Sequence, residues 1–394
     1  MADNFDIFVF TWNAGGLRLC ETASEYQANK DRSKFFNFKK DCAAPDFYEG
    51  IRAKVLGSNP AVVVISTQNE AEKGTYFHSS FLPQQMGEIN YGLLKREKVV
   101  GEGSSLRMSI YIRYDQFDIV QQETMPDNKF HGDNGQVNIS CKIGNRYSKA
   151  IGAYLRHPTY GKFAFVSTYL PGNIELLNLG STIKDLDEAS KEAAMLSANQ
   201  LCLISILHKL TTDLTEAFTP DHVVLLGDLN YDIIVEGWEN KDIIEWLNEH
   251  NTAKSLKWLQ QHDQLNQVMN FRNDLGIPLR GYSEGVENQG PLFAPTFNLK
   301  RDRSDSCNNP ISGSSDYQLN RDCYTSSKAD ENSGHSLAWA DRILYKEILT
   351  SPYMLSCQAY NSMDMGNTHK SNHAPVYSLF SLKPANDDVV KDRQ

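Results

Sequence analysis

Short runs of hydrophobic residues recur along the chain, and several of them end in a polar side chain. The clearest run is residues 223–231, where β-branched and aliphatic residues lead into Gly-Asp-Leu-Asn. Runs of this length that end at turn residues predict buried β-strands. By the same pattern, further strands are predicted at residues 5–10, 61–65, 108–113, 163–168, 337–345 and 374–380.

Other stretches have helical spacing instead. Between residues 184 and 210, apolar residues recur every three or four positions, which predicts an amphipathic helix just before the 223–231 strand. Residues 240–271 are also predicted to be helical, and a helix is expected near residue 50. This alternation of strands and helices favours an α/β fold. Residues 300–334 predict a long surface loop, and residues 383–394 a disordered tail.

Composition narrows the function classes. The 394 residues carry a formal net charge of −10, which argues against a general nucleic-acid binder because such proteins usually have a basic face. Seven scattered cysteines without paired spacing fit a reducing compartment and no zinc site. The first residues lack a signal sequence, and no apolar run reaches membrane-spanning length. A soluble cytoplasmic protein is therefore expected.

The polar residues at the predicted strand ends suggest one site. If the strands form two packed sheets, these side chains meet at one end of the sandwich. Carboxylates, amides and a histidine together can hold a phosphoryl group and activate water, so phosphoester hydrolysis is the predicted chemistry. The residues are Asn13, Gln68–Asn69–Glu70, Tyr169, Asp228, Asn230, Asp341 and His373.

Eight ordered motifs resemble those of the inositol polyphosphate 5-phosphatases, within the endonuclease/exonuclease/phosphatase superfamily. They are TWNAGG at 11–16, STQNE at 66–70, STYLPGN at 167–173, GDLNYD at 227–232, HDQLNQ at 262–267, APTFNLK at 294–300, AWADRILYK at 338–346 and SNHAPV at 371–376. The resemblance implies a four-layer α/β sandwich, with two packed mixed β-sheets flanked by helices, as in deoxyribonuclease I. It also implies one catalytic domain at residues 1–382.

The resemblance further implies Mg²⁺-dependent hydrolysis of a phosphate monoester on an inositol ring. The substrate would be a free inositol phosphate or a phosphoinositide, the latter with peripheral membrane contact. Asp228 would activate the attacking water, and His373, oriented by Asp341, would donate to the phosphoryl group. The other implied site residues are Asn230 and Tyr169 in catalysis, Asn13, Asn173, Lys300 and Lys328 in substrate binding, and Glu70 with Asn13 as Mg²⁺ ligands.

Several positions depart from the family pattern. The family has Gln-Glu where this chain has Gln68–Asn69–Glu70, so the carboxylate is displaced by one residue. An extended strand would turn Glu70 to the opposite face, whereas a bulge would restore it. The family's Ser-Asp-His is Ser371–Asn372–His373, and the histidine of its Ser-His-Leu is Tyr169. Basic residues that mark preference for a neighbouring 4-phosphate are unmatched, for example at Asn298.

Three hypotheses follow. The first is a 5-phosphatase-type hydrolase with an altered substrate preference. The second is a non-catalytic descendant that binds phosphoinositides or a protein, since Asn69 and Asn372 stand where the family has acids. The third is a nuclease, which rests on superfamily kinship and on Tyr169.

Overall fold

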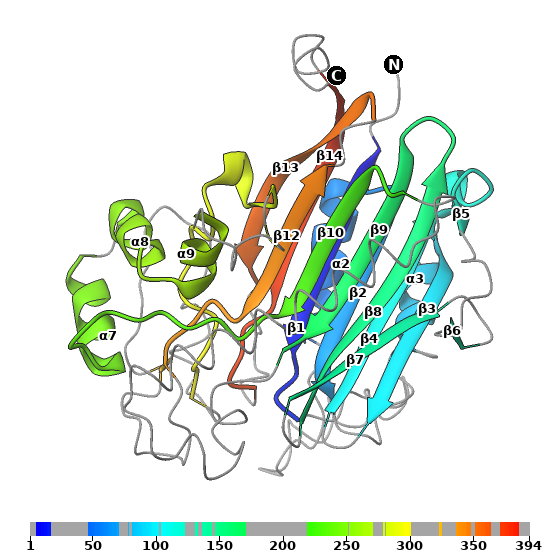
Figure 1. Cartoon of the computed structure of the whole chain (residues 1–394). Coiled ribbons are helices and arrows are strands. Elements are labelled where there is room, and N and C mark those ends of the chain that lie inside the picture. The colour runs from blue at the N-terminus through cyan, green and yellow to red at the C-terminus, as the bar shows by residue number, and fades with distance from the viewer. Residues whose placement is uncertain are drawn as a thin grey trace, which may run out of the picture.

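The computed structural model describes residues 5–16, 46–70, 78, 81–101, 104–122, 131–132, 136–143, 146–170, 219–250, 252–270, 279, 281–300, 323–324, 336–347, 351–363 and 371–385. Two β-sheets pack face to face and helices cover their outer sides (Figure 1). Within the described ranges, no helix is long and apolar enough to cross a membrane.

The first sheet has six strands in the order β13-β14-β1-β2-β4-β3. Its strands are β1 (Asp6–Asn13), β2 (Val62–Glu70), β3 (Tyr91–Gly101), β4 (Ser104–Arg113), β13 (Tyr353–Ser362) and β14 (Val376–Pro384). Strands β1 and β2 are parallel, and the other neighbours in this sheet are antiparallel. Their polar C-terminal residues therefore lie side by side, with Asn13 opposite Gln68.

The second sheet has eight strands, seven of them in the order β11-β12-β10-β9-β8-β7-β6, with β5 paired to β8. They are β5 (Gln121–Gln122), β6 (His131–Gly132), β7 (Gln136–Ile143), β8 (Arg146–His157), β9 (Gly161–Tyr169), β10 (His222–Asp228), β11 (Ser283–Glu284) and β12 (Asp341–Glu347). Strands β9 and β10 are parallel, which places Tyr169 opposite Asp228. On the other side of β10, antiparallel β12 places Asp341 opposite the same residue.

Helices cover the outer face of each sheet. Tyr48, Ile51 and Val55 of α2 (Asp46–Ser58) pack against the outer side of β1 and β2. Leu265 and Val268 of α9 (Gln264–Asn270) pack against the outer side of β9 and β10. The other helices in the described ranges are α3 (Leu82–Gly87), α7 (Asn240–Glu249) and α8 (Ala253–Gln260), with short 3-10 turns at Tyr114–Gln116 and Val286–Asn288.

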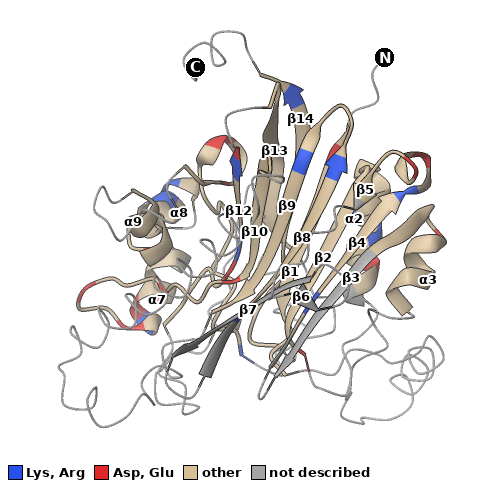
Figure 2. Ribbon diagram, turned by 45° about the vertical axis from the view of Figure 1, so that its right-hand side comes forward, with Lys and Arg blue, Asp and Glu red and all other residues tan. Residues whose placement is uncertain are grey.

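The predicted two-sheet α/β sandwich is confirmed, as are the strands predicted from hydrophobic runs, except that the strand predicted at 337–345 begins at Asp341. Their alternating side chains fill the space between the sheets, with Val9, Val64 and Leu226 among the buried residues. In Figure 2 the strands are uncharged along most of their length. The helix predicted at 184–210 and most of the loop predicted at 300–334 lie outside the described residues.

The cysteines differ from the expectation in one respect. Cys357 is free and buried, whereas Cys323 is disulfide-bonded. A structural disulfide is more usual in oxidising compartments than in the reducing one that the scattered cysteines suggested. A cytoplasmic location therefore stays a prediction, and the disulfide at Cys323 does not favour it.

Candidate active site

Asn13 connects the two sheets at the end where β1, β10 and β12 meet. Its side-chain nitrogen donates to Oδ2 of Asp228 at 2.6 Å. Its backbone N–H donates to Oδ1 of Asp341 at 2.8 Å. All three residues are buried, with exposed fractions of 3% or less. One asparagine at the end of β1 therefore positions two carboxylates from the opposite sheet.

His373 joins this cluster from the segment before β14. Its Nδ1–H donates to Oδ2 of Asp341 at 2.7 Å. The Oγ of Ser371 donates to the carbonyl of Asn13 at 2.8 Å and accepts from the His373 N–H at 3.1 Å. The ring of His373 also lies 4.5 Å from that of Phe297, measured between centroids. These contacts fix the orientation of the imidazole, and the bond to Asp341 directs Nε2 away from the carboxylate.

Asp228 has the most perturbed acidity in the cluster. Burial raises its pKa, the nearby His373 lowers it and the charge of Asp341 raises it again, with a net increase from 3.8 to about 7. The hydrogen bonds from Asn13 and from the Asn230 N–H, at 2.6 and 3.1 Å, offset part of the increase. A carboxyl group that titrates near neutral pH suits a general base.

The Gly-Asp-Leu-Asn turn has local features that place Asp228. Gly227 has a φ of +138°, and a Cβ there would lie 1.9 Å from the carbonyl oxygen of Thr168. Only glycine allows β10 to pass this close to β9. Asn230 adopts a φ of +50° and donates from its side chain to the Leu170 carbonyl at 2.6 Å. The turn is therefore tied to the end of β9.

Glu70 lies in a different environment from Asn13. A β-bulge between Gln68 and Glu70 absorbs Asn69, whose φ is +52°. The bulge places Glu70 on the face that residue 69 would occupy in a regular strand. The bulge is the second of the two alternatives that the sequence left open. On that outer face, Glu70 contacts Arg107 at 3.0 Å and His78 at 3.2 Å and accepts a hydrogen bond from Thr67.

The bonds around Gln68 show that the neighbouring face is the inner one. Its side-chain nitrogen donates to the hydroxyls of Thr11 and Ser66, at 3.0 and 2.9 Å. The Oγ of Ser66 in turn lies 2.5 Å from that of Ser167 in the second sheet. Gln68 and Asn13 therefore face the space between the sheets, and Glu70 faces away from it.

Lys149 is a candidate site residue that the sequence analysis missed. It lies opposite Tyr169 in the β8–β9 register, and Tyr169 lies opposite Asp228. It lies two residues before Ile151 and four before Ala153, which both belong to the inter-sheet core. Every second residue of a strand faces the same side, so Lys149 belongs to the inner face. Only 3% of Lys149 is exposed. Its place could have been found by assigning the apolar run at residues 150–155 to a strand, because Lys149 directly precedes that run.

The remaining predicted residues are less closely connected to the cluster. Lys300 is exposed and follows Leu299, whose N–H donates to the carbonyl of Asn372 at 2.9 Å, so it lies near the His373 segment. Asn173 and Lys328 lie outside the described residues.

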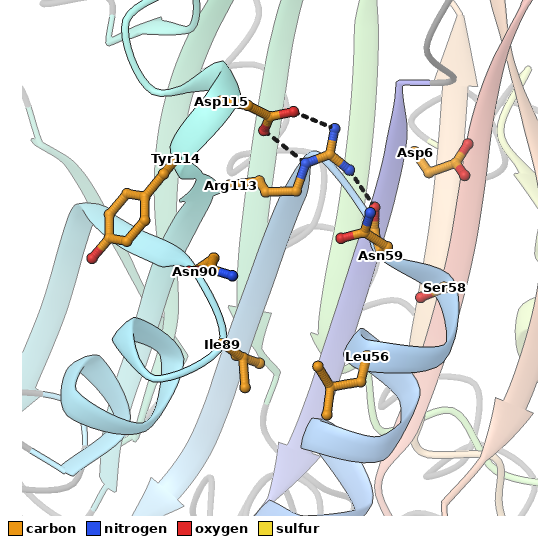
Figure 3. Close-up of a pocket in the computed structure, with 9 residues that line it drawn as sticks. All are labelled: Asp6, Leu56, Ser58, Asn59, Ile89, Asn90, Arg113, Tyr114 and Asp115. Atoms are coloured by element: carbon orange, nitrogen blue, oxygen red, sulfur yellow. Dashed lines mark hydrogen bonds and ion pairs between the residues drawn. The ribbon is translucent and has the colours of Figure 1, made fainter.

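A cavity of about 720 Å³ lies at the other end of the first sheet. It is lined by Asp6 at the start of β1 and Arg113 at the end of β4, among others (Figure 3). Arg113 donates to both oxygens of Asp115, at 2.7 and 3.0 Å, and to the carbonyl of Asn59 at 2.5 Å. This cavity is therefore separate from the Asp228 cluster, which lies at the opposite strand ends.

The described residues do not form a ready Mg²⁺ site. Each oxygen of Asp228 and of Asp341 accepts a hydrogen bond, and Glu70 is ion-paired with Arg107. No group of three or more His, Cys, Asp or Glu side chains in the described ranges is arranged to hold a metal ion. The Glu70–Asn13 pair implied by the family resemblance therefore does not fit Mg²⁺ in this arrangement, because the Glu70 carboxylate is already in contact with Arg107, His78 and Thr67.

Comparison with known proteins identifies the relatives of this chain. Residues 58–379 match the family described as Endonuclease/Exonuclease/phosphatase family 2. The chain is 28% identical over 183 residues to phosphatidylinositol 3,4,5-trisphosphate 5-phosphatase 1 of Homo sapiens, and 30% identical over 173 residues to that of Xenopus laevis. These stretches cover 46% and 44% of this chain but 12% and 14% of the relatives, so the chain matches a small part of them.

Solved structures share the fold at low sequence identity. The inositol polyphosphate 5-phosphatase domain of SPsynaptojanin, in complex with inositol (1,4)-bisphosphate and calcium, matches with a TM-score of 0.57 and 17% identity. The match covers 99% of this chain and 90% of that one. A Cimex nitrophorin, as its ferrous NO complex, matches with a TM-score of 0.54 and 14% identity, over 97% of this chain and 100% of that one. Both show the fold.

Proposed function

We propose that this chain, which belongs to the Endonuclease/Exonuclease/phosphatase family 2, hydrolyses a phosphate monoester of an inositol phosphate or a phosphoinositide. It is an inositol 5-phosphatase-like domain of that family. The observation that carries the proposal is the hydrogen-bonded set of Asn13, Asp228, Asp341 and His373. These four come from four separate segments, and burial raises the pKa of Asp228 to about 7, which suits a general base.

Asp228 is the proposed general base. Its carboxylate would accept a proton from a water molecule as the water oxygen bonds to phosphorus. The bond from phosphorus to the inositol oxygen then breaks, this oxygen takes a proton from solvent water, and the alcohol and inorganic phosphate leave. Because burial raises the pKa of Asp228 to about 7, the carboxylate is a stronger base than an exposed aspartate and is still partly ionised at neutral pH.

His373 and Asn13 are proposed to bind the phosphoryl group. Asp341 holds Nδ1 of His373 and stabilises its protonated form, so Nε2–H can donate to a phosphoryl oxygen. A donor placed where charge develops in the transition state contributes roughly 3–4 kcal/mol to barrier lowering. Asn230 and Tyr169 lie next to Asp228 and are proposed to complete the site.

Lys149 is the proposed contact for a further phosphate of the substrate. It is a buried cation on the inner face, one strand beyond Tyr169. An inositol polyphosphate carries several negative charges, and a buried lysine can offset one of them. The chain's net charge of −10 makes such a local cation important, because the molecule as a whole repels a polyanion.

Divalent-cation dependence remains part of the proposal. Mg²⁺ would neutralise phosphoryl charge if it bound with the substrate. Support comes from a fold relative whose structure contains a calcium ion, and the arrangement of Glu70 opposes a ready protein site.

The test is phosphate release from a panel of soluble and lipid-borne inositol phosphates, with Mg²⁺ and with a chelator. Wild-type protein is compared with Asp228→Ala and with Glu236→Gln, an exposed acid outside the site. We expect release by the wild type and the Glu236 variant and a loss of at least 100-fold in Asp228→Ala. Equal background release by all three proteins would instead support a binding protein that has lost catalysis.

A further inference from the structure

We propose that Arg107 is the permanent counter-ion of Glu70 and excludes a divalent cation from this carboxylate. The idea rests on the proposed function, because family resemblance is what suggests a metal role for Glu70. Its consequence is specific to this chain: Glu70 stabilises the end of β2 and does not ligate Mg²⁺.

The first support is the contact geometry. The Nε atom of Arg107 lies 3.0 Å from Oε2 of Glu70, and the exposed fractions of the two side chains are 3% and 0%. Nε2 of His78 lies 3.2 Å from Oε1, and the Thr67 hydroxyl donates to the same oxygen. Both carboxylate oxygens are thus surrounded by protein groups that favour its ionised form. The carboxylate is already paired with a cation in a site closed to water.

The second support is that the backbone fixes these partners. Arg107 lies opposite Thr67 in the β2–β4 pair, and Ser109 lies two residues further along the same face. Nδ1 of His78 lies 2.7 Å from the Ser109 hydroxyl, and its Nε2 lies 2.9 Å from that of Thr67. The bulge at Asn69 turns Glu70 onto this face. The network therefore follows from strand register and does not depend on one flexible contact.

The third support is charge balance. A doubly charged cation bound to Glu70 would lie within contact range of the Arg107 guanidinium. Like charges at such a distance repel strongly where water cannot screen them. If Arg107 withdrew, it would be left as a buried cation without its counter-ion, which is also unfavourable. Either route weakens cation binding, so this position selects against the metal that a lone buried carboxylate would attract.

Mn²⁺ binding, measured by electron paramagnetic resonance without substrate, tests the proposal. Glu70→Gln should bind Mn²⁺ as the wild type does. Arg107→Met, which keeps much of the side-chain length but removes the charge, should bind at least about tenfold more tightly than the wild type. The double variant Arg107→Met/Glu70→Gln should lose that gain. Arg107→Lys keeps the charge and serves as the matched control, with no gain expected.

Two outcomes would overturn the proposal. One is Mn²⁺ binding by the wild type that disappears in Glu70→Gln, because Glu70 would then be a ligand. The other is a folded Arg107→Met protein, checked by circular dichroism, that gains no affinity. If Arg107→Met does not fold, the comparison of wild type with Glu70→Gln still decides the question. Since no step measures phosphate release, failure here is distinguishable from failure of the proposed hydrolase activity.

Discussion

Replacing Asp228 by asparagine should stabilise the protein at alkaline pH. The substitution keeps the shape of the side chain and removes the buried charge. In the folded protein burial raises the pKa of Asp228 from 3.8 to about 7. Between these values the native state binds more protons than the unfolded state does. The free energy of unfolding therefore falls as pH rises from about 4 to about 7, and the destabilisation is complete above that range.

The structure sets an upper limit on the effect. The gap between 3.8 and about 7, at ~1.4 kcal/mol per pH unit, corresponds to ~4 kcal/mol above pH 7. Asparagine replaces one acceptor oxygen by an NH₂ group, which loses a hydrogen bond from Asn13 or from the Asn230 N–H and costs ~1 kcal/mol. The net gain at pH 8 should be ~3 kcal/mol. At pH 5 the native carboxyl is mostly protonated, so most of the gain disappears.

Urea unfolding of chelator-treated protein at pH 5 and pH 8 measures this difference. The Glu236→Gln variant, altered at an exposed acid, is the control and should behave like the wild type at both pH values. Two results would contradict the reasoning. The Asp228→Asn variant could be less stable than wild type at pH 8, or its gain could be as large at pH 5 as at pH 8. Either would mean that the buried charge is already well stabilised.

Other predictions follow from the same cluster. Gly227→Ala should prevent stable folding or cost several kcal/mol, because its Cβ would meet a carbonyl oxygen at 1.9 Å. Gly237 has a φ of +77° but open space around it, so Gly237→Ala should cost only ~1 kcal/mol. Thermal unfolding measures both. Asp341→Asn should lower kcat by roughly 10²–10⁴-fold with little change in KM, because His373 loses the acceptor that stabilises its protonated form. If phosphate release is observed, kcat/KM should fall as pH drops below about 7, where Asp228 becomes protonated; a flat profile down to pH 5 would exclude it as the base.

The meeting of Asn13, Asp228, Asp341 and His373 could be predicted from sequence for a physical reason. Each residue follows or begins a strong hydrophobic run, and such runs must be buried in a sheet. Parallel β1–β2 and β9–β10 pairs, with antiparallel β12, bring those run ends to one edge. The prediction needed only the assumption that these strands share one sandwich, and it did not need to know which strands are neighbours.

The environment of Glu70 could not be predicted in the same way. Its orientation depends on whether Asn69 is absorbed as a bulge, and a bulge leaves little trace in the sequence beyond a residue that tolerates positive φ. Its ionised form depends on His78 and Arg107, which both lie outside any recognised motif. Lys149 was missed for a different reason, because the apolar run at residues 150–155 of β8, which it directly precedes, was not among the predicted strands.

Fold similarity alone does not decide between catalysis and binding in this protein. The TM-score to an inositol polyphosphate 5-phosphatase domain is 0.57 and that to a nitrophorin is 0.54, so one sandwich accommodates a phosphate site and an NO complex. The feature that favours catalysis over binding is the charge that surrounds each buried carboxylate. Glu70 has a guanidinium beside it, whereas burial, with a smaller contribution from the charge of Asp341, raises the pKa of Asp228 to about 7 despite the opposing effect of His373. A buried acid whose pKa is raised reduces stability at neutral pH, so its presence at the meeting point of the strands argues for a chemical role.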